Sequence, residues 1–221
     1  MTGSTFYINQ TSMKNLKVII YSLLVLVLCA ANVFGQNWSF GAQTGVTIAN
    51  EIYKSDPKEL LADYNLETKN DPVIGYSLNA HFEYKSKGIW GVSMEPGFMM
   101  KGTQSKAGGV KLNLLYVQIP VLSDFYLVDK LSLSIGPEFA YLLSAKRKND
   151  FGTSPISLDK FDIAGIIGAN YKIYNNLSAG VRFSNSFIKN SEVIITDSNN
   201  QLAGEVKIYN RYYQLFIRVT I

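Results

Sequence analysis

Residues 111–143 read KLNLLYVQIPVLSDFYLVDKLSLSIGPEFAYLL, and polar and apolar side chains alternate through most of this stretch. A period of two is typical of a β-strand, because successive side chains leave opposite faces of the chain. One face collects apolar residues: Leu115, Val117, Ile119, Val121, Phe125, Leu131, Leu133, Ile135, Phe139 and Tyr141. The other collects Tyr116, Gln118, Asp124, Tyr126, Ser132, Ser134, Gly136, Glu138 and Ala140. The two halves are separated by Leu127 to Lys130 alone, which predicts an antiparallel hairpin.

The arms of this hairpin are long. Each has about a dozen residues, whereas strands of globular proteins usually have ~5–6. A tilted strand that crosses a membrane needs ~9–11 residues. The hairpin therefore favours a membrane protein.

Composition narrows the class of protein. The 221 residues are 47% hydrophobic and only 17% charged, against ~25% charged residues in a typical soluble protein. The net charge of +4 comes from scattered lysines and arginines, so no nucleic-acid partner is expected. A single cysteine excludes a disulfide framework and a multi-cysteine metal site, and no cofactor is expected.

The first 35 residues resemble an export signal. A basic segment from Met13 to Lys17 precedes an apolar run, Val18 to Ala31, and small residues before Gln36. This order predicts a signal peptide over residues 1–35, with cleavage after Gly35 and with Met13 as an alternative start. The apolar run is too short for a spanning helix, which needs ~20 residues.

The remainder, residues 36–221, reads as eight alternating strands. Besides the two hairpin arms, they are residues 38–47, 74–84, 90–100, 161–173, 177–187 and a final strand that ends the chain. Short turns at 85–88, 127–130 and 174–176 alternate with long polar segments at 49–71, 101–110, 144–160 and 188–206. Short periplasmic turns and long outer loops are typical of transmembrane barrels. The predicted fold is thus an all-β, eight-stranded antiparallel up-and-down transmembrane β-barrel in the outer membrane.

The alternation does not by itself decide which face points outward. A soluble lipocalin-like barrel would place its apolar face inside. Here the polar face is mostly Gly, Ser, Asn and Gln, which suits the crowded interior of a small barrel. Aromatic residues also lie near strand ends, as membrane interfaces require: Trp38, Tyr84, Trp90, Tyr126, Tyr141, Tyr171 and Tyr213. Both features favour the membrane interpretation.

The chain resembles the outer-membrane β-barrel proteins of Bacteroidetes, a group that includes the PorT-like proteins. The similar segments are FGAQTGVTIAN, SMEPGFMMKG, LLYVQIPVLSDFY, LSIGPEFAYLLSA, FDIAGIIGANYKIYNNLSAGVRFSNSF and YNRYYQLFIRVTI. The resemblance covers residues 36–221 and implies an eight-stranded outer-membrane barrel without an assigned reaction. A secretion role is implied only for the PorT-like subset. Gln118 stands where the family usually has Glu, so an interior acid of relatives is neutral here.

The charged residues of the polar face form the candidate site: His81, Glu83, Glu95, Asp124, Glu138, Asp162, Lys172, Arg182 and Arg218. They would form either a path for ions or a packed interior of paired charges. A buried unpaired ion costs several kcal/mol, so we expect acids and bases to pair and the barrel not to be an open pore.

Catalysis is not expected, and neither a catalytic nor a metal-binding residue is predicted. A lipid-modifying enzyme would need Ser77 or Ser93 beside His81, the only histidine. Pro96, Pro120 and Pro137 fall inside predicted strands, where bulges or kinks are expected.

The long segments would carry any binding function. Lys146, Arg147 and Lys148 make a basic cluster that could contact lipopolysaccharide phosphates, or be an ordinary solvated loop. The predicted function is a structural or binding barrel in contact with the outer-membrane lipid. Its main alternative is a component of secretion machinery with a protein partner. A narrow channel and a lipid-modifying enzyme follow.

Overall fold

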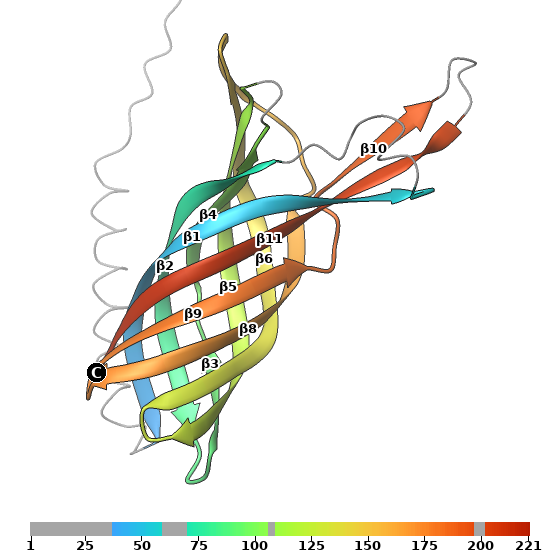
Figure 1. Cartoon of the computed structure of the whole chain (residues 1–221). Coiled ribbons are helices and arrows are strands. Elements are labelled where there is room, and N and C mark those ends of the chain that lie inside the picture. The colour runs from blue at the N-terminus through green and yellow to red at the C-terminus, as the bar shows by residue number, and fades with distance from the viewer. Residues whose placement is uncertain (1–36, 59–69, 106–108, 197–201) are drawn as a thin grey trace, which may run out of the picture. The chain divides into compact units, whose positions relative to one another are not determined.

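The computed structural model describes residues 37–58, 70–105, 109–196 and 202–221. They form eleven strands (Figure 1): β1 Trp38–Asp56, β2 Asp71–Lys85, β3 Trp90–Met94, β4 Gly97–Gln104, β5 Lys111–Val128, β6 Leu131–Asn149, β7 Gly152–Pro155, β8 Phe161–Tyr174, β9 Leu177–Ser186, β10 Ser191–Thr196 and β11 Leu202–Thr220. The signal peptide predicted for residues 1–35 lies outside the described residues. No helix among those residues is long and apolar enough to cross a bilayer.

Eight strand positions, which we call staves, close into a ring, and one of them is divided between β3 and β4. This ring confirms the predicted fold. The order around it is β1, β2, β3 with β4, β5, β6, β8, β9 and β11, and the pairings from β2 round to β11 and from β11 to β1 are antiparallel. The first and last staves pair over sixteen positions, from Gly41 opposite Thr220 to Asp56 opposite Glu205. A closed ring leaves no unpaired edge in its wall.

The two faces of the wall have opposite chemistry, and the polar face is inside. On β11, Leu215 is 60% exposed whereas its neighbour Gln214 is 2% exposed. On β6, Phe139 is half exposed and Glu138 is completely buried. An interior of charged and amide groups inside an apolar wall is the inverse of a lipocalin-like barrel, and this rules out the soluble alternative.

The predicted strand over residues 90–100 is divided at Glu95 and Pro96 into β3 and β4. Proline has no backbone N–H to donate to the ladder. Pro120 and Pro137 lie within β5 and β6, inside strands as predicted, and pair with Glu138 and Gly165. The β5–β6 pairing is interrupted between Pro120 and Ser123, opposite Gly136 and Pro137, and its register is the same on both sides of the gap, so no bulge is found at these two prolines.

The segments predicted as long loops are wrong in extent, because the strands continue into them. β1 runs on to Asp56, β4 to Gln104 and β6 to Asn149, and β6 then turns back into β7. β10 pairs with the early part of β11. The result is a second sheet region, beyond the ring, in which β10, β11 and β1 lie side by side and project from the barrel (Figure 1). We call it the extension end, and the end with the short turns the turn end.

Candidate functional site

The centre of the interior is Glu95, at the break between β3 and β4. The break exposes backbone groups that other strands satisfy: the Glu95 N–H donates to Pro120 O at 3.0 Å, and the Ala80 N–H donates to Pro96 O at 2.9 Å. These bonds fix the Glu95 side chain in the lumen, where it is fully buried.

Two arginines hold the Glu95 carboxylate from different strands. Arg182 on β9 donates from both terminal nitrogens, with the Nη2–Oε1 distance 2.7 Å, and Arg218 on β11 donates to Oε1 at 2.7 Å. Gln43 on β1 donates to Oε2 at 3.2 Å and accepts from Arg218 at 2.9 Å. Both guanidinium groups also lie over the Phe216 ring, at 4.5 and 5.3 Å from its centroid. One carboxylate thus links β1, β9 and β11 across the lumen.

His81 on β2 extends this contact toward the turn end. Its Nδ1 lies 3.2 Å from Glu95 Oε1, and its Nε2 lies 3.1 Å from Glu83 Oε2. Glu83 also accepts hydrogen bonds from Ser39 and from the Tyr126 hydroxyl. We call Gln43, His81, Glu83, Glu95, Arg182 and Arg218 the Glu95 cluster.

A second cluster lies nearer the extension end around Lys101. Its ammonium is 2.7 Å from Glu138 Oε1 on β6 and 3.8 Å from Asp162 Oδ2 on β8. Tyr212 donates to Glu138, and Asn210 donates to Asp162 at 2.8 Å. The Lys101 Nζ also lies over the rings of Tyr116 and Tyr212. Sequence reasoning missed Lys101 because it counted residue 101 as the start of a loop; the alternation from Phe98 outward to Met99 inward was the available signal.

Of the other two residues predicted to lie in the interior, Asp124 is inside the barrel and Lys172 is not. Asp124 on β5 is buried and accepts hydrogen bonds from Ser93, at 2.5 Å, and from Ser134. Lys172 does not belong to the interior, contrary to the prediction. It is exposed at the turn end, where β8 changes register between Lys172 and Tyr174 before its turn.

The contacts of His81, Ser77 and Ser93 fit structural packing of the interior better than a catalytic role. His81 directs both ring nitrogens at carboxylates, Ser77 accepts from Gln214 at 2.6 Å, and Ser93 is bound to Asp124. The structure therefore does not bring either serine to His81 as the lipid-modifying alternative required. Among the described residues, no group of three or more His, Cys, Asp or Glu side chains is placed to hold a metal ion.

Solved structures with a similar fold are small outer-membrane proteins. They include the attachment invasion locus protein Ail of Yersinia pestis (13% identity, TM-score 0.49, 84% of this chain and 100% of that one) and OprG of Pseudomonas aeruginosa (13%, 0.47, 84% and 95%). Neisserial surface protein A is a third (12%, 0.43, 83% and 97%). No curated protein sequence matches the chain.

A family match covers most of the chain. Residues 34–192 match the family described as "Outer membrane protein beta-barrel domain". The span includes every stave up to β9, and the structure supplies the ring and the apolar outer wall that such a domain needs. The chain therefore belongs to the outer membrane protein beta-barrel domain family.

Proposed function

We propose that this outer-membrane protein is a closed barrel with a binding role at the cell surface, without catalysis and without an open ion path. The Glu95 cluster carries the proposal. Its carboxylate, two guanidinium groups and an amide bridge strands on different sides of an eight-stranded ring, whose interior is only wide enough for side chains. An ion crossing the lumen would have to displace buried, paired charges, which is costly.

Conductance in planar bilayers tests the closed barrel. Purified, refolded protein is expected to give no steady unit conductance, because the cluster fills the lumen. The double variant Glu95→Ser with Arg182→Ser opens part of that space and serves as the positive comparison. Regular conductance steps of the unchanged protein would support the narrow-channel alternative and contradict the proposal.

The surface ligand we propose is the phosphate-bearing head group of lipopolysaccharide. Lys146, Arg147 and Lys148 are all exposed near the far end of β6, and Lys111 of β5 lies directly opposite Lys148. Like charges at directly opposite positions are destabilising. A bound polyanion would relieve that repulsion, and arginine and lysine are suited to phosphate.

Binding to vesicles that contain lipopolysaccharide tests this ligand. Replacing Lys111, Lys146, Arg147 and Lys148 with alanine is expected to weaken binding by at least an order of magnitude, at ~1 kcal/mol per basic residue near an anionic surface. The control replaces Lys85 and Lys87 at the turn end. Equal binding by the two variants would contradict the assignment of these four residues.

The secretion role implied by the PorT-like resemblance stays a prediction. The feature that would serve a protein partner is β10, whose described pairing is with β11 alone and whose Val193 and Ile194 are exposed. An added strand could pair with such an edge. A specific protein that co-purifies after mild detergent extraction, and is lost when Ile194 is changed to Pro, would support the secretion role.

A further inference from the structure

The outer wall of the barrel has a mostly apolar hollow. It occupies ≈ 670 Å³ on the outward side of β1, β11, β9 and β8, and ends at Leu131 on β6. Three small outward residues, Thr44, Ala169 and Ala179, lie among the larger side chains of Tyr171, Val181 and Leu215. The wall is therefore recessed here, within the band that faces acyl chains in an outer-membrane barrel.

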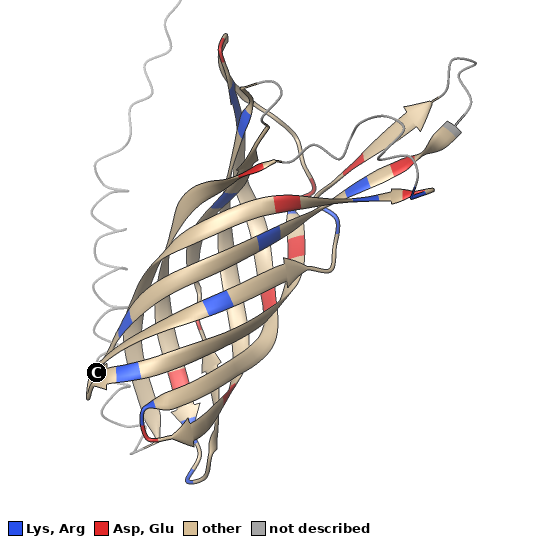
Figure 2. Cartoon of the chain, viewed as in Figure 1, with Lys and Arg blue, Asp and Glu red and all other residues tan. Residues whose placement is uncertain are grey.

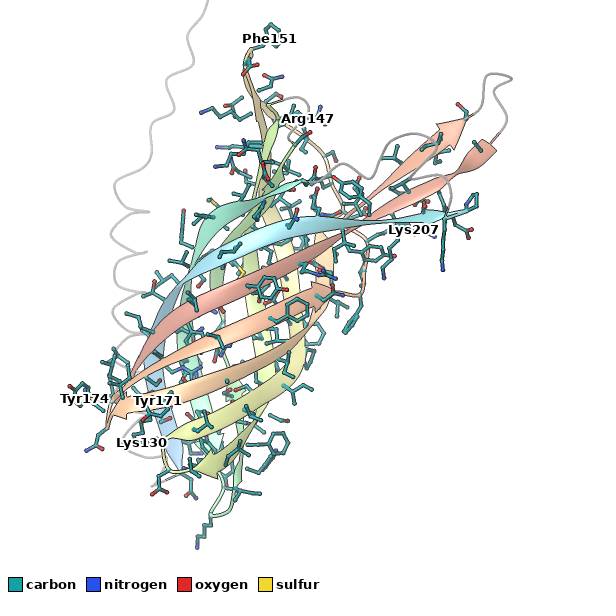
Figure 3. All side chains as sticks on the ribbon, viewed as in Figure 1. Lys130, Arg147, Phe151, Tyr171, Tyr174 and Lys207 are labelled. Carbon is teal, nitrogen blue, oxygen red and sulfur yellow. The ribbon has the colours of Figure 1, made fainter. Side chains whose placement is uncertain are left out.

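A second, polar hollow lies at the turn end of the same strands, and the residues that line it adjoin those of the first hollow along the chain. Leu131 and Tyr171 are opposite each other in the β6–β8 register, and the next residues, Lys130 and Lys172, line a space of ≈ 330 Å³ with Tyr174. The Lys172 N–H donates to the carbonyl of Lys130 at 2.7 Å, so the two lysines leave adjacent backbone positions. Figure 3 shows Lys130, Tyr171 and Tyr174 gathered at this end of the barrel.

The charge of the second hollow favours an anionic occupant. Lys130 and Lys172 are exposed, and neither has an ion-pair partner among the residues that the structure describes. Asp129 also lines the space and offsets one of the two positive charges. Basic residues beside a membrane-embedded apolar surface bind phosphate head groups, and tyrosines are favoured at the same depth.

We propose that these two hollows form one binding site for an anionic phospholipid of the periplasmic leaflet. An acyl chain lies in the recess beside Ala169 and Ala179, and the phosphate lies at Lys130 and Lys172. The site is at the opposite end of the barrel from the basic cluster proposed to bind lipopolysaccharide, so either site can fail its test without affecting the other.

Native mass spectrometry of the detergent-solubilised protein, with equal amounts of phosphatidylglycerol and phosphatidylcholine added, tests the site. The unchanged protein is expected to retain phosphatidylglycerol preferentially. Lys130→Ala with Lys172→Ala should lower that preference on the order of tenfold, since each basic residue near the head group contributes attraction. Asp129→Asn should raise it, because a repulsive carboxylate is removed. Lys85→Ala with Lys87→Ala, at a different turn, is the matched control and should leave it unchanged.

A second pair of variants tests the acyl-chain recess separately. Ala169→Phe and Ala179→Phe fill it from the outward face and should reduce retention of both lipids, whereas Ala42→Phe, outward on β1 but outside the hollow, should not. Unboiled gel mobility verifies that each variant is folded. The proposal is overturned if the unchanged protein shows no preference, if the filled variants retain as much lipid, or if the occupant is a second copy of the chain.

Discussion

At the scale of single residues, Glu95 determines whether the interior charges are balanced. Glu95→Ala would leave Arg182 and Arg218 buried without their shared carboxylate, and removing one partner of a buried ion pair costs about 3–5 kcal/mol. We expect that loss in the free energy of unfolding, measured by urea titration of the detergent-folded barrel. Glu192→Ala is the control, because Glu192 pairs with Lys189 at a partly exposed site where the loss should be at most about 1 kcal/mol. Equal losses for the two variants would mean that the Glu95 contacts do not stabilise the barrel.

The sequence predicted which residues face inward better than it predicted which of them meet. Alternation places Glu95 and Arg182 on the polar face, but 87 positions separate them and only the ring brings them together. Lys172 keeps the same register, opposite the buried Ser178, and is nevertheless exposed because it lies at the turn end of β8. Alternation carries no information about where a strand ends, and both Lys172 and the missed Lys101 are errors of that kind.

At the scale of elements, the β5–β6 hairpin that identified the fold contains a close approach between the backbones of its two strands. A Cβ placed on Gly136 would lie 2.0 Å from the carbonyl oxygen of Val121, next to the interruption in pairing after Pro120. Gly136→Ala must therefore move one strand, and we expect a loss of roughly 1–3 kcal/mol in unfolding free energy. Gly88→Ala is the control, since the nearest atom there is at 3.8 Å. A neutral Gly136→Ala would show that the two strands are further apart than the structure places them.

The sequence predicted the strands well where one face of the strand is apolar. It predicted them less well in the segments that project past the bilayer band. Inside the bilayer band, large apolar and polar residues alternate clearly, as on β2, β8 and β9. Past that band both faces can be polar, and segments such as Lys54 to Asp56 or Glu205 to Lys207 read as loops although they pair across β1 and β11. In Figure 2 the charged positions follow one another along these projecting strands. Their pairing comes from continuation of the ring register, which a single strand's sequence does not contain.

At the scale of the whole molecule, the closed ring depends on the pairing of the first stave with the last. These staves are far apart in sequence, so the contact forms only when every intermediate strand is in register. The charged interior has the same requirement, because Gln43 on β1 and Arg218 on β11 meet at 2.9 Å only in the closed ring. Closure of the ring and pairing of the interior charges therefore stabilise each other. The Glu95 cluster needs both the strand pairing of the wall and the side-chain contacts across the lumen.

A disulfide across the closing pair tests this dependence. Val46 and Leu215 are opposite each other on β1 and β11, and both face outward. Opposite residues of antiparallel strands have Cα atoms about 4.5–5.5 Å apart, within the range that a disulfide needs. With Cys29 changed to Ser, the variant Val46→Cys with Leu215→Cys should form an internal crosslink in folded protein, seen as a mobility change on a denaturing gel that reductant reverses. Val46→Cys with Val219→Cys is the control, because Val219 lies opposite Ala42 and about 13 Å further along the strand. Crosslinking of the control instead would place the closing register elsewhere, and crosslinked dimers would mean that the first stave pairs with another molecule.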